Sequence, residues 1–375
     1  MDIKEYYDNI LSRRTGVRKD YGMLDAADYR RRLKGAFMSR AAGCTLGAPV
    51  EGWSLTQIDD YAKETGMTDP YSDYWPSIPE PERVRYIIQT FGDYTRDKIC
   101  GIPADDDIGY TILALLIVKE HGREFTLADV AESWQKYITE CYTAERVAMD
   151  NLQKGIAPEH AAEIDNPYEE WIGADIRVDG YGYMSPANPE EAARMAYVDS
   201  YISHRGEGVY GAMYFAAAIS IAFAVNDVKT ALTEALAYIP SDCELYRGLS
   251  WAIDLWDGVG DFKNAAKLVD ERYPGMHPVH TINNACLTVF ALALGGSNIG
   301  NVIANAVAMA HDCDCTAATA GSIAGACYGI EALDEHWYKN FGDKVNSFFN
   351  GPKSYSISEL LADFENFASQ MPKVI

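Results

Sequence analysis

Apolar and small residues recur at three- and four-residue spacing through most of the chain, and this pattern predicts helices. The stretch YRRRLKGAFMSRAAGCTLG, residues 29–47, has this spacing and ends in glycine, as many helices do. Uncharged runs at residues 208–226 and between Asp314 and Glu331 predict helices that are buried on all sides. Further helices are expected near residues 105–122, 126–138, 189–203, 228–238, 242–256, 260–272, 280–296, 299–311, 316–332, 335–348 and 356–370. β-Branched runs such as Arg83–Ile88 are short and lack regular alternation, so the sequence predicts an all-α fold.

Two long segments interrupt the helical pattern. Residues 54–103 contain prolines at 70, 76, 79, 81 and 103 and predict a loop with short helices, placed over a functional site. Residues 143–186 are mixed and rich in glycine and tyrosine, and within them EEWIGADIRVDGYGYMSP (169–186) is expected to form loop structure able to line a pocket. Residues 1–27 predict a polar and aromatic arm laid on the body. Because no Pro/Gly/Ser-rich linker separates two cores, residues 28–375 are expected to form one large multi-helix domain.

The charge balance excludes some classes of partner. Asp and Glu number 55 and Lys and Arg number 32, which gives a net charge of −23 and a pI near 4.6. Nucleic-acid grooves and anionic membrane surfaces both require a basic face, so neither partner is expected. Residues 208–226 are long enough to span a bilayer, but they lack basic flanks and predict a buried central helix instead.

Cysteine usage and the first residues indicate the cellular compartment. The opening MDIKEYYDNI has no apolar segment of the signal-peptide kind. The eight cysteines show no regular spacing, so reduced thiols and a cytoplasmic location are expected. The sequence gives no indication of an oligomeric state.

Two acidic clusters stand at the starts of apolar, small-residue helices: DDD at residues 105–107 and HDCDC at residues 311–315. Either cluster alone is most simply interpreted as a capped or exposed helix start. Three adjacent aspartates repel one another, however, unless solvent or a cation relieves them. If the two helix starts meet, their carboxylates form an oxygen-rich cage for one or two Mg²⁺ or Mn²⁺ ions, which could activate a water molecule. Glu51, His204 and the loop at residues 173–186 are further candidates for that cavity.

Three segments then resemble the ADP-ribosylglycohydrolase family, in the family's order. GAFMSRAAGCTLGAPVEGW (35–53) is similar to the opening helix and its G-D-x-x-G-x-P-x-E turn. PADDDIGYTILAL (103–115) is similar to the T-D-D-T block, and HDCDCTAATAGSIAGACYG (311–329) to G-x-D-T-D-T with its small-residue helix. YISHRGEGVYGAMYFAAAIS (201–220) is more weakly similar to the family's Thr-His segment. Together the segments extend over nearly the whole expected domain.

The resemblance implies an orthogonal all-α domain with a binuclear Mg²⁺ or Mn²⁺ site at helix ends, which hydrolyses the glycosidic bond at C1″ of an ADP-ribosyl group. The metal ligands it implies are Asp106 and Asp107, with Asp105 in the place of the preceding Thr (or Asp105 and Asp106, if the register shifts by one), together with Asp312, Asp314 and Cys315. Glu51 is expected beside the metals as a base or gate, so Glu51 and Asp106 are the candidate catalytic carboxylates. His204 matches the histidine that helps to hold ADP-ribose.

This chain departs from the family pattern at several positions. Cys44 replaces the Asp of the opening block, and Cys313 and Cys315 replace Thr residues of the last block. The N-G-x-x-M-R segment is not recognisable, and IGADIRVDGYGYMSP stands there instead, with Arg177 and Asp179 as candidate substrate-binding residues. The leading hypothesis is a metal-dependent hydrolase of ADP-ribosyl compounds. The alternatives are a hydrolase of a smaller ribosyl or nucleoside-like compound, a non-catalytic member of the family, and an unrelated helical protein.

Overall fold

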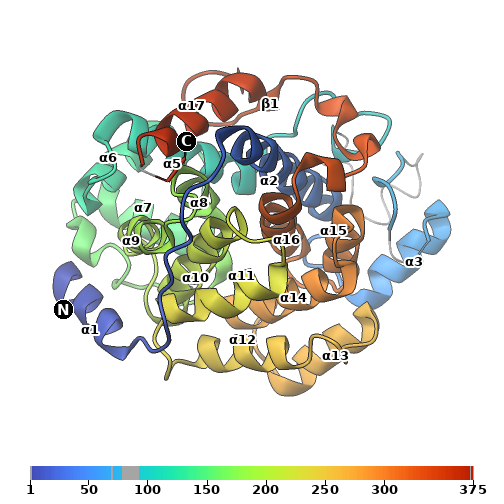
Figure 1. The fold of residues 1–375 in the computed structure, drawn as a ribbon, viewed down its shortest axis with the longest axis horizontal. Helices are drawn as coiled ribbons and strands as arrows, with labels where there is room; N and C mark the ends of the chain where they lie inside the picture. The colour runs from blue at the N-terminus through green and yellow to red at the C-terminus, as the bar shows by residue number, and fades with distance from the viewer. Residues whose placement is uncertain (1, 69–70, 78–92, 372, 375) are drawn as a thin grey trace.

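Helices account for nearly all of the regular structure in residues 2–68, 71–77, 93–371 and 373–374, which are the residues that the computed structural model describes (Figure 1). The α-helices are α1 (Ile3–Arg13), α2 (Ala26–Gly47), α3 (Leu55–Thr65), α5 (Asp106–His121), α6 (Leu127–Tyr137), α7 (Thr143–Gln153), α8 (Asp179–Met184), α9 (Pro189–Ser200), α10 (Gly206–Ala222), α11 (Val228–Ala235), α12 (Glu244–Asp254), α13 (Phe262–Arg272), α14 (Thr281–Gly295), α15 (Ile299–Ala308), α16 (Cys313–Tyr328) and α17 (Ile357–Ser369). The predicted all-α class is confirmed.

Short elements connect these helices. The 3-10 helices are η1 (Ala48–Val50), η3 (Pro158–His160), η4 (Ile172–Arg177), η5 (Leu236–Tyr238), η6 (Ile330–Ala332), η7 (Glu335–Trp337) and η8 (Lys339–Phe341). The one sheet found among the described residues pairs β1 (Val345–Asn346) with β2 (Ser354–Tyr355) in antiparallel register. The β-branched run Arg83–Ile88 lies outside the described residues.

The centre of the fold is the contact between α2 and α16, which lie side by side in Figure 1. A Cβ on Gly35, in the first half of α2, would lie 2.6 Å from the carbonyl carbon of Gly329, just past the end of α16. A Cβ on Gly47, at the end of α2, would lie 2.4 Å from the Cα of Asp314, at the start of α16. The helices are therefore antiparallel and pack backbone against backbone. This contact brings the end of α2 to the acidic start of α16.

Helix boundaries follow the sequence signals at most positions. Asp105 caps α5 by accepting a hydrogen bond from the Asp107 N–H at 3.1 Å, and α5 ends before Gly122, whose φ is +78°.

The uncharged segment predicted as a buried helix is α10, whose residues 208–222 are all buried. None of the helices within the described ranges, α10 included, has both the length and the apolar character needed to cross a bilayer.

Two segments differ from the prediction. Residues 169–186 contain the 3-10 helix η4 and the short helix α8 rather than a loop, because Ile176, Tyr181 and Met184 are buried in the core. Residues 335–348 form two 3-10 turns and a short strand rather than a helix. Gly342 has φ +56° and ends the helical turns there.

The predicted N-terminal arm contains α1, which packs on α9. The ring of Tyr7 lies 4.6 Å from that of Tyr197, and Ile10 is fully buried. Further along, the Leu24 N–H donates a hydrogen bond to the carbonyl of Lys373, so the segment before α2 contacts the other end of the chain.

Candidate metal centre and active site

Three acidic segments that are far apart in the sequence meet at one place. Glu51 follows α2 through the turn η1, Asp105–Asp107 begin α5, and Asp312–Cys315 begin α16. The Gly52 N–H donates to the His311 carbonyl at 3.2 Å and joins the first segment to the third. Atoms able to ligate a metal form three overlapping groups, each with its atoms within 4.8 Å of one another: Cys44–Asp105–Asp107, Asp107–Asp314–Cys315 and Glu51–Asp312–Asp314. Asp107 and Asp314 link the groups into one cluster, as the sequence predicted for the two helix starts.

Asp107 is held from behind by Arg40, a fully buried arginine on α2. The Nη2 of Arg40 donates to the Asp107 carbonyl at 2.8 Å and lies 3.3 Å from Asp107 Oδ1. Its Nε donates to Thr111 Oγ1 at 2.8 Å, and its Nη1 lies 3.0 Å from Asp179 Oδ2. Because removing one partner of a buried ion pair is costly, this cation fixes the place of Asp107.

On the cavity side, the described residues that line the site supply no opposite charge to these carboxylates. The Oδ1 atoms of Asp312 and Asp314 are buried and have no hydrogen-bond partner among the described residues. Burial, and then the charges of Glu51 and Asp312, raise the pKa of Asp314 well above its usual value. Burial also raises the pKa of Asp107, although Arg40 acts in the opposite direction. Crowded carboxylates of this kind must bind protons or a cation, and orphaned oxygens suit a hard divalent ion. The donor set therefore fits the predicted metal.

Glu51 stands at the mouth of the cluster. The residue is exposed to solvent, but its carboxyl group faces Asp312 and Asp314. Burial of this carboxyl group, followed by the charges of Asp312 and Asp105, raises the pKa of Glu51 to about 8. A carboxylate with access to both water and the cluster can take up a proton and pass it to solvent.

The cluster opens into a cavity of about 390 Å³, a size typical of small-molecule sites. Its lining residues come from the starts of α5, α7 and α16, from η4, and from isolated positions: Glu51, Tyr94, Ala104, Asp105, Asp106, Glu140, Tyr142, Thr143, Glu145, Ile172, Gly173, Ile176, Val279, Asp312, Asp314, Cys315 and Phe348. Tyr94 lies at this wall with its hydroxyl 3.0 Å from Asp105 Oδ2. No residue between 78 and 92 is described, so only part of the predicted loop at 54–103 is placed relative to the cavity.

The three adjacent aspartates face different ways. Consecutive residues of a helix point about 100° apart. Asp107 therefore faces Arg40 and the cluster, whereas Asp106 lines the cavity and belongs to none of the three ligand groups. Asp105 reaches the cluster from the cap position. The structure groups Asp105 and Asp107 with the other candidate ligands and places Asp106 on the adjacent cavity wall, so the assignment of all three as metal ligands stays a prediction.

The predicted substrate-binding residues lie behind the cavity wall. The guanidinium of Arg177 is buried, with Nε donating to Asp199 at 2.8 Å and Nη1 donating to Glu145. Asp179 pairs with Arg40. Neither Arg177 nor Asp179 lines the cavity, and substrate contact by either residue stays a prediction. Glu145, which accepts a hydrogen bond from Arg177, does line the cavity, so Arg177 positions one of the lining carboxylates.

His204 is also buried and outside the cavity lining. Its Nδ1 lies 2.8 Å from Ser203 Oγ, and its Nε2 has no hydrogen-bond partner among the described residues. Burial, and then the charges of Arg177 and Arg205, hold the pKa of His204 well below its usual value. The imidazole is therefore neutral. Contact between His204 and a substrate stays a prediction.

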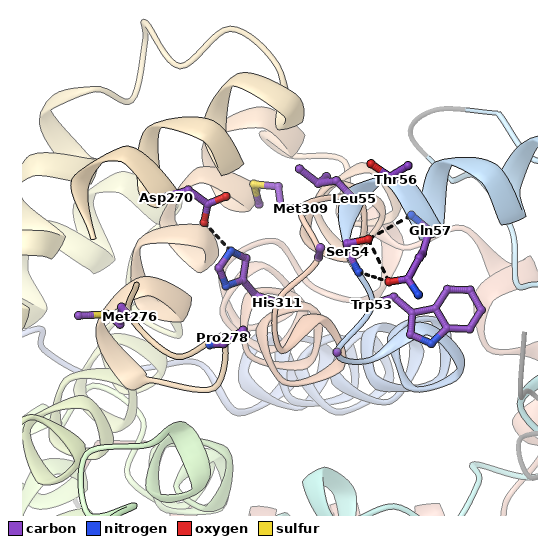
Figure 2. Close-up of a pocket in the computed structure, with 12 residues that line it drawn as sticks. Trp53, Ser54, Leu55, Thr56, Gln57, Asp270, Met276, Pro278, Met309 and His311 are labelled. Carbon is purple, nitrogen blue, oxygen red and sulfur yellow. Dashed lines mark hydrogen bonds and ion pairs between the residues drawn. The ribbon is translucent and has the colours of Figure 1, made fainter. Parts of the chain in front are cut away.

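A second cavity, of about 490 Å³, is drawn in Figure 2. Gly52, Pro278 and His311 line it, and each precedes or follows a residue of the carboxylate cavity. Figure 2 shows the His311 ring directed at Asp270, with Nε2 2.9 Å from Asp270 Oδ1. Helix α15 ends at Ala308 rather than at residue 311, because Ala310 and His311 have φ of +63° and +61°. This strained turn aims Asp312 at the cluster.

The sequence-based prediction left out two residues of this site, one ligand of the cluster and the arginine that holds Asp107 from behind. Cys44 was noted only as a departure from the family pattern, and Arg40 was not singled out. Arg40 is the one charged residue in the run GAFMSRAAGCTLG. A lone charge among small and apolar helix positions indicates a buried partner of opposite charge, and that signal was available.

Comparisons with known proteins bear on this site. Residues 25–366 match the family model for ADP-ribosylglycohydrolase. A search of curated proteins finds no match. Among solved structures, the chain is similar to one described as "ADP-ribosylglycohydrolase-related protein complex", with a TM-score of 0.62 and 18% sequence identity, over 92% of this chain and 99% of that one. At this level of identity the likeness shows a shared fold.

Proposed function

The chain belongs to the ADP-ribosylglycohydrolase family, and from this premise we propose that it is a metal-dependent hydrolase of the glycosidic bond at C1″ of an ADP-ribosyl group, attached to a protein or to a small compound. The observation that carries the proposal is the meeting of Glu51 with the acidic starts of α5 and α16, where buried oxygens of Asp312 and Asp314 have no hydrogen-bond partner in the described part of the chain. Buried carboxylates without a cation are costly, so the arrangement is explained by a ligand that supplies positive charge.

This donor set has room for two divalent ions, and its oxygen ligands suit Mg²⁺ or Mn²⁺. The residues that would hold them are those of the three linked groups, with Asp106 on the adjacent wall: Cys44, Glu51, Asp105, Asp107, Asp312, Asp314 and Cys315. Asp107 and Asp314 each belong to two groups and are the candidates for shared ligands. When bound, such ions would supply positive charge that keeps these carboxylates ionised, binds ribose hydroxyls and orients a water molecule.

The chain's own residues then move the proton and position the sugar. In the hydrolysis, a bond forms between the water oxygen and C1″, the bond from C1″ to the leaving group breaks, and the leaving group ends with a proton. Glu51, at the mouth and in contact with solvent, takes the proton from water, and this proton balances the one that the leaving group gains. Asp106 is the other candidate catalytic carboxylate among the acidic residues of the cavity. Glu145 and Tyr142 form part of the opposite lining, where the rest of the substrate would lie.

One observation favours a second candidate, hydrolysis of a smaller ribosyl or nucleoside-like compound. Among the described residues that line the cavity, seven are acidic and none is Lys, Arg or His. A diphosphate is usually bound by cationic side chains or by backbone N–H groups. A neutral glycoside needs no such partner, so the described part of the lining suits it.

A panel of labelled compounds distinguishes these functions. Metal-free protein is given Mn²⁺ and then incubated with an ADP-ribosylated peptide, a free ADP-ribosyl compound and a nucleoside, and the released sugar is measured by chromatography. Release of ADP-ribose supports the first candidate, and release of ribose alone supports the second. Asp314→Asn should abolish release, while Asp257→Asn, at an exposed carboxylate paired with Lys229, should not. Metal binding without turnover on the whole panel would identify a non-catalytic member.

A further inference from the structure

Two thiols belong to the carboxylate cluster, and each is grouped with Asp107. The Cys44 Sγ is grouped with Asp105 and Asp107, and the Cys315 Sγ with Asp107 and Asp314. Both cysteines are free, and their residue exposures are 1% and 6%. The third group, Glu51–Asp312–Asp314, contains oxygen ligands alone. The cluster therefore has a mixed sulfur–oxygen side and an oxygen-only side.

The geometry at Cys315 already resembles a coordination site. The Cys315 thiol donates to Asp107 Oδ2 with an S–O separation of 3.3 Å. Typical Zn–S and Zn–O bond lengths place two such ligands about 3.1 Å apart at a right angle and about 3.6 Å apart at a tetrahedral angle. An ion could thus replace the thiol proton between these atoms with little movement of either side chain.

A second observation indicates that this side receives a ligand. Asp314, which is 4% exposed and shares a group with Asp107 and Cys315, has a buried Oδ1 without a hydrogen-bond partner among the described residues. Cys313, between the two aspartates, differs from Cys315. Its thiol lies 3.6 Å from the Gly47 carbonyl and belongs to none of the three groups.

We propose that Cys44 and Cys315, which belong to the two ligand groups that share Asp107, give this side of the centre mixed thiolate–carboxylate ligation, which takes a borderline divalent ion of the Zn²⁺, Fe²⁺ or Co²⁺ kind in preference to Mg²⁺. Glu51, Asp312 and Asp314 form the oxygen-only position that suits Mg²⁺ or Mn²⁺. The inference rests on the proposed function for the existence of the metal centre and adds the identity of one ion. Each thiol that coordinates gives its proton to solvent, the sulfur retains the electron pair, and nothing is oxidised or reduced.

Cobalt spectroscopy on the full-length chain tests this inference without an activity assay. Metal-free, reduced protein is titrated with Co²⁺, and absorbance is recorded in the near ultraviolet, where a cobalt–thiolate bond gives a charge-transfer band. We expect the band in the wild type and its persistence in excess Mg²⁺. Cys44→Ser and Cys315→Ser should each weaken the band and reduce Co²⁺ affinity by about tenfold or more, with little change in Mg²⁺ affinity. The matched control Cys313→Ser should keep the band.

A variant that replaces a thiol by a carboxylate tests the same inference if a serine variant folds poorly. Cys44→Asp should shift the preference toward Mg²⁺, measured by competition between Mg²⁺ and Co²⁺ in protein shown to be folded by circular dichroism. Co²⁺ binding without a charge-transfer band, or a band that survives both serine substitutions, would overturn this inference and leave the proposed function intact. Absence of binding by Co²⁺, Mn²⁺ and Mg²⁺ alike would overturn both.

Discussion

The substitution Gly47→Ala tests whether the contact between α2 and α16 builds the metal centre. A Cβ at this position would lie 2.4 Å from the Cα and 2.5 Å from the backbone nitrogen of Asp314. Non-bonded carbon atoms prefer about 3.5–4.0 Å. The two helices must therefore separate by more than about 1 Å at the point where Asp314 joins the cluster. Gly47 has φ −77° and ψ −42°, which alanine adopts freely, so backbone strain does not contribute.

The expected magnitude combines two opposite effects. Overpacking of a close contact costs about 1–3 kcal/mol, and a clash with backbone on the facing helix falls at the upper end of that range. The better helix propensity of alanine offsets up to about 1 kcal/mol. We expect a net loss of about 2 kcal/mol in the free energy of unfolding. Metal sites tolerate about 0.5 Å of displacement, so Mn²⁺ affinity should fall by about tenfold or more.

Urea denaturation and Mn²⁺ titration measure the two effects separately. Gly258→Ala is the matched control, because the nearest atom to its added Cβ is 3.8 Å away, and it should change stability by less than about 0.5 kcal/mol. If Gly47→Ala unfolds at the wild-type urea concentration and binds Mn²⁺ as tightly as the wild type, the close contact does not position Asp314.

Three further changes probe the same network. Arg40→Met leaves Asp107 and Asp179 without their buried cation, so the free energy of unfolding measured in urea should fall by about 3–5 kcal/mol. The control Arg40→Lys keeps a positive charge and should lose less. Equal stability of Arg40→Met and the wild type would contradict the role of these ion pairs. Mn²⁺ at one hundred times its Kd should stabilise the wild type by about 2.7 kcal/mol and Asp314→Asn by much less, and a thermal shift of equal size in both would place the ion elsewhere. His204 has a depressed pKa in the folded state, so below the unfolded value of about 6.5 the unfolded chain binds the extra proton and stability falls as the pH falls, by up to about 1.4 kcal/mol per pH unit. His204→Gln should lose less stability between pH 7 and 5, and parallel pH curves for the two proteins would refute the assignment.

Much of the fold could be predicted from local signals. The small-residue faces of α2 and α16 and the apolar run of α10 follow directly from the sequence pattern, and aspartate caps mark the start of α5. The two acidic helix starts were expected to form a metal cage if they met, and the family resemblance implied that they do. The prediction of a helix at residues 335–348 was wrong. The aromatic spacing there resembles that of a helix, but Gly342 has a positive φ, which ends the helical turns.

The finer geometry of the site depends on long-range packing and could not be predicted. The choice of Asp105 and Asp107 over Asp106 follows from where α5 begins and how it rotates against Arg40. Whether His204 faces the cavity or its rear wall likewise depends on how its segment packs, which no local pattern specifies. The turn at Ala310 and His311 adopts a conformation that neither residue type favours, so only the assembled structure reveals it.

Release of free ADP-ribose from an ADP-ribosyl compound, followed while Mn²⁺ is added back to metal-free protein, shows whether the carboxylate cluster is the centre of a metal-dependent glycohydrolase. We predict no release without metal, a saturable rise as Mn²⁺ binds, and no rise at any Mn²⁺ concentration in Asp314→Asn. Release that is independent of added metal, or that is equal in wild type and Asp314→Asn, would contradict the account.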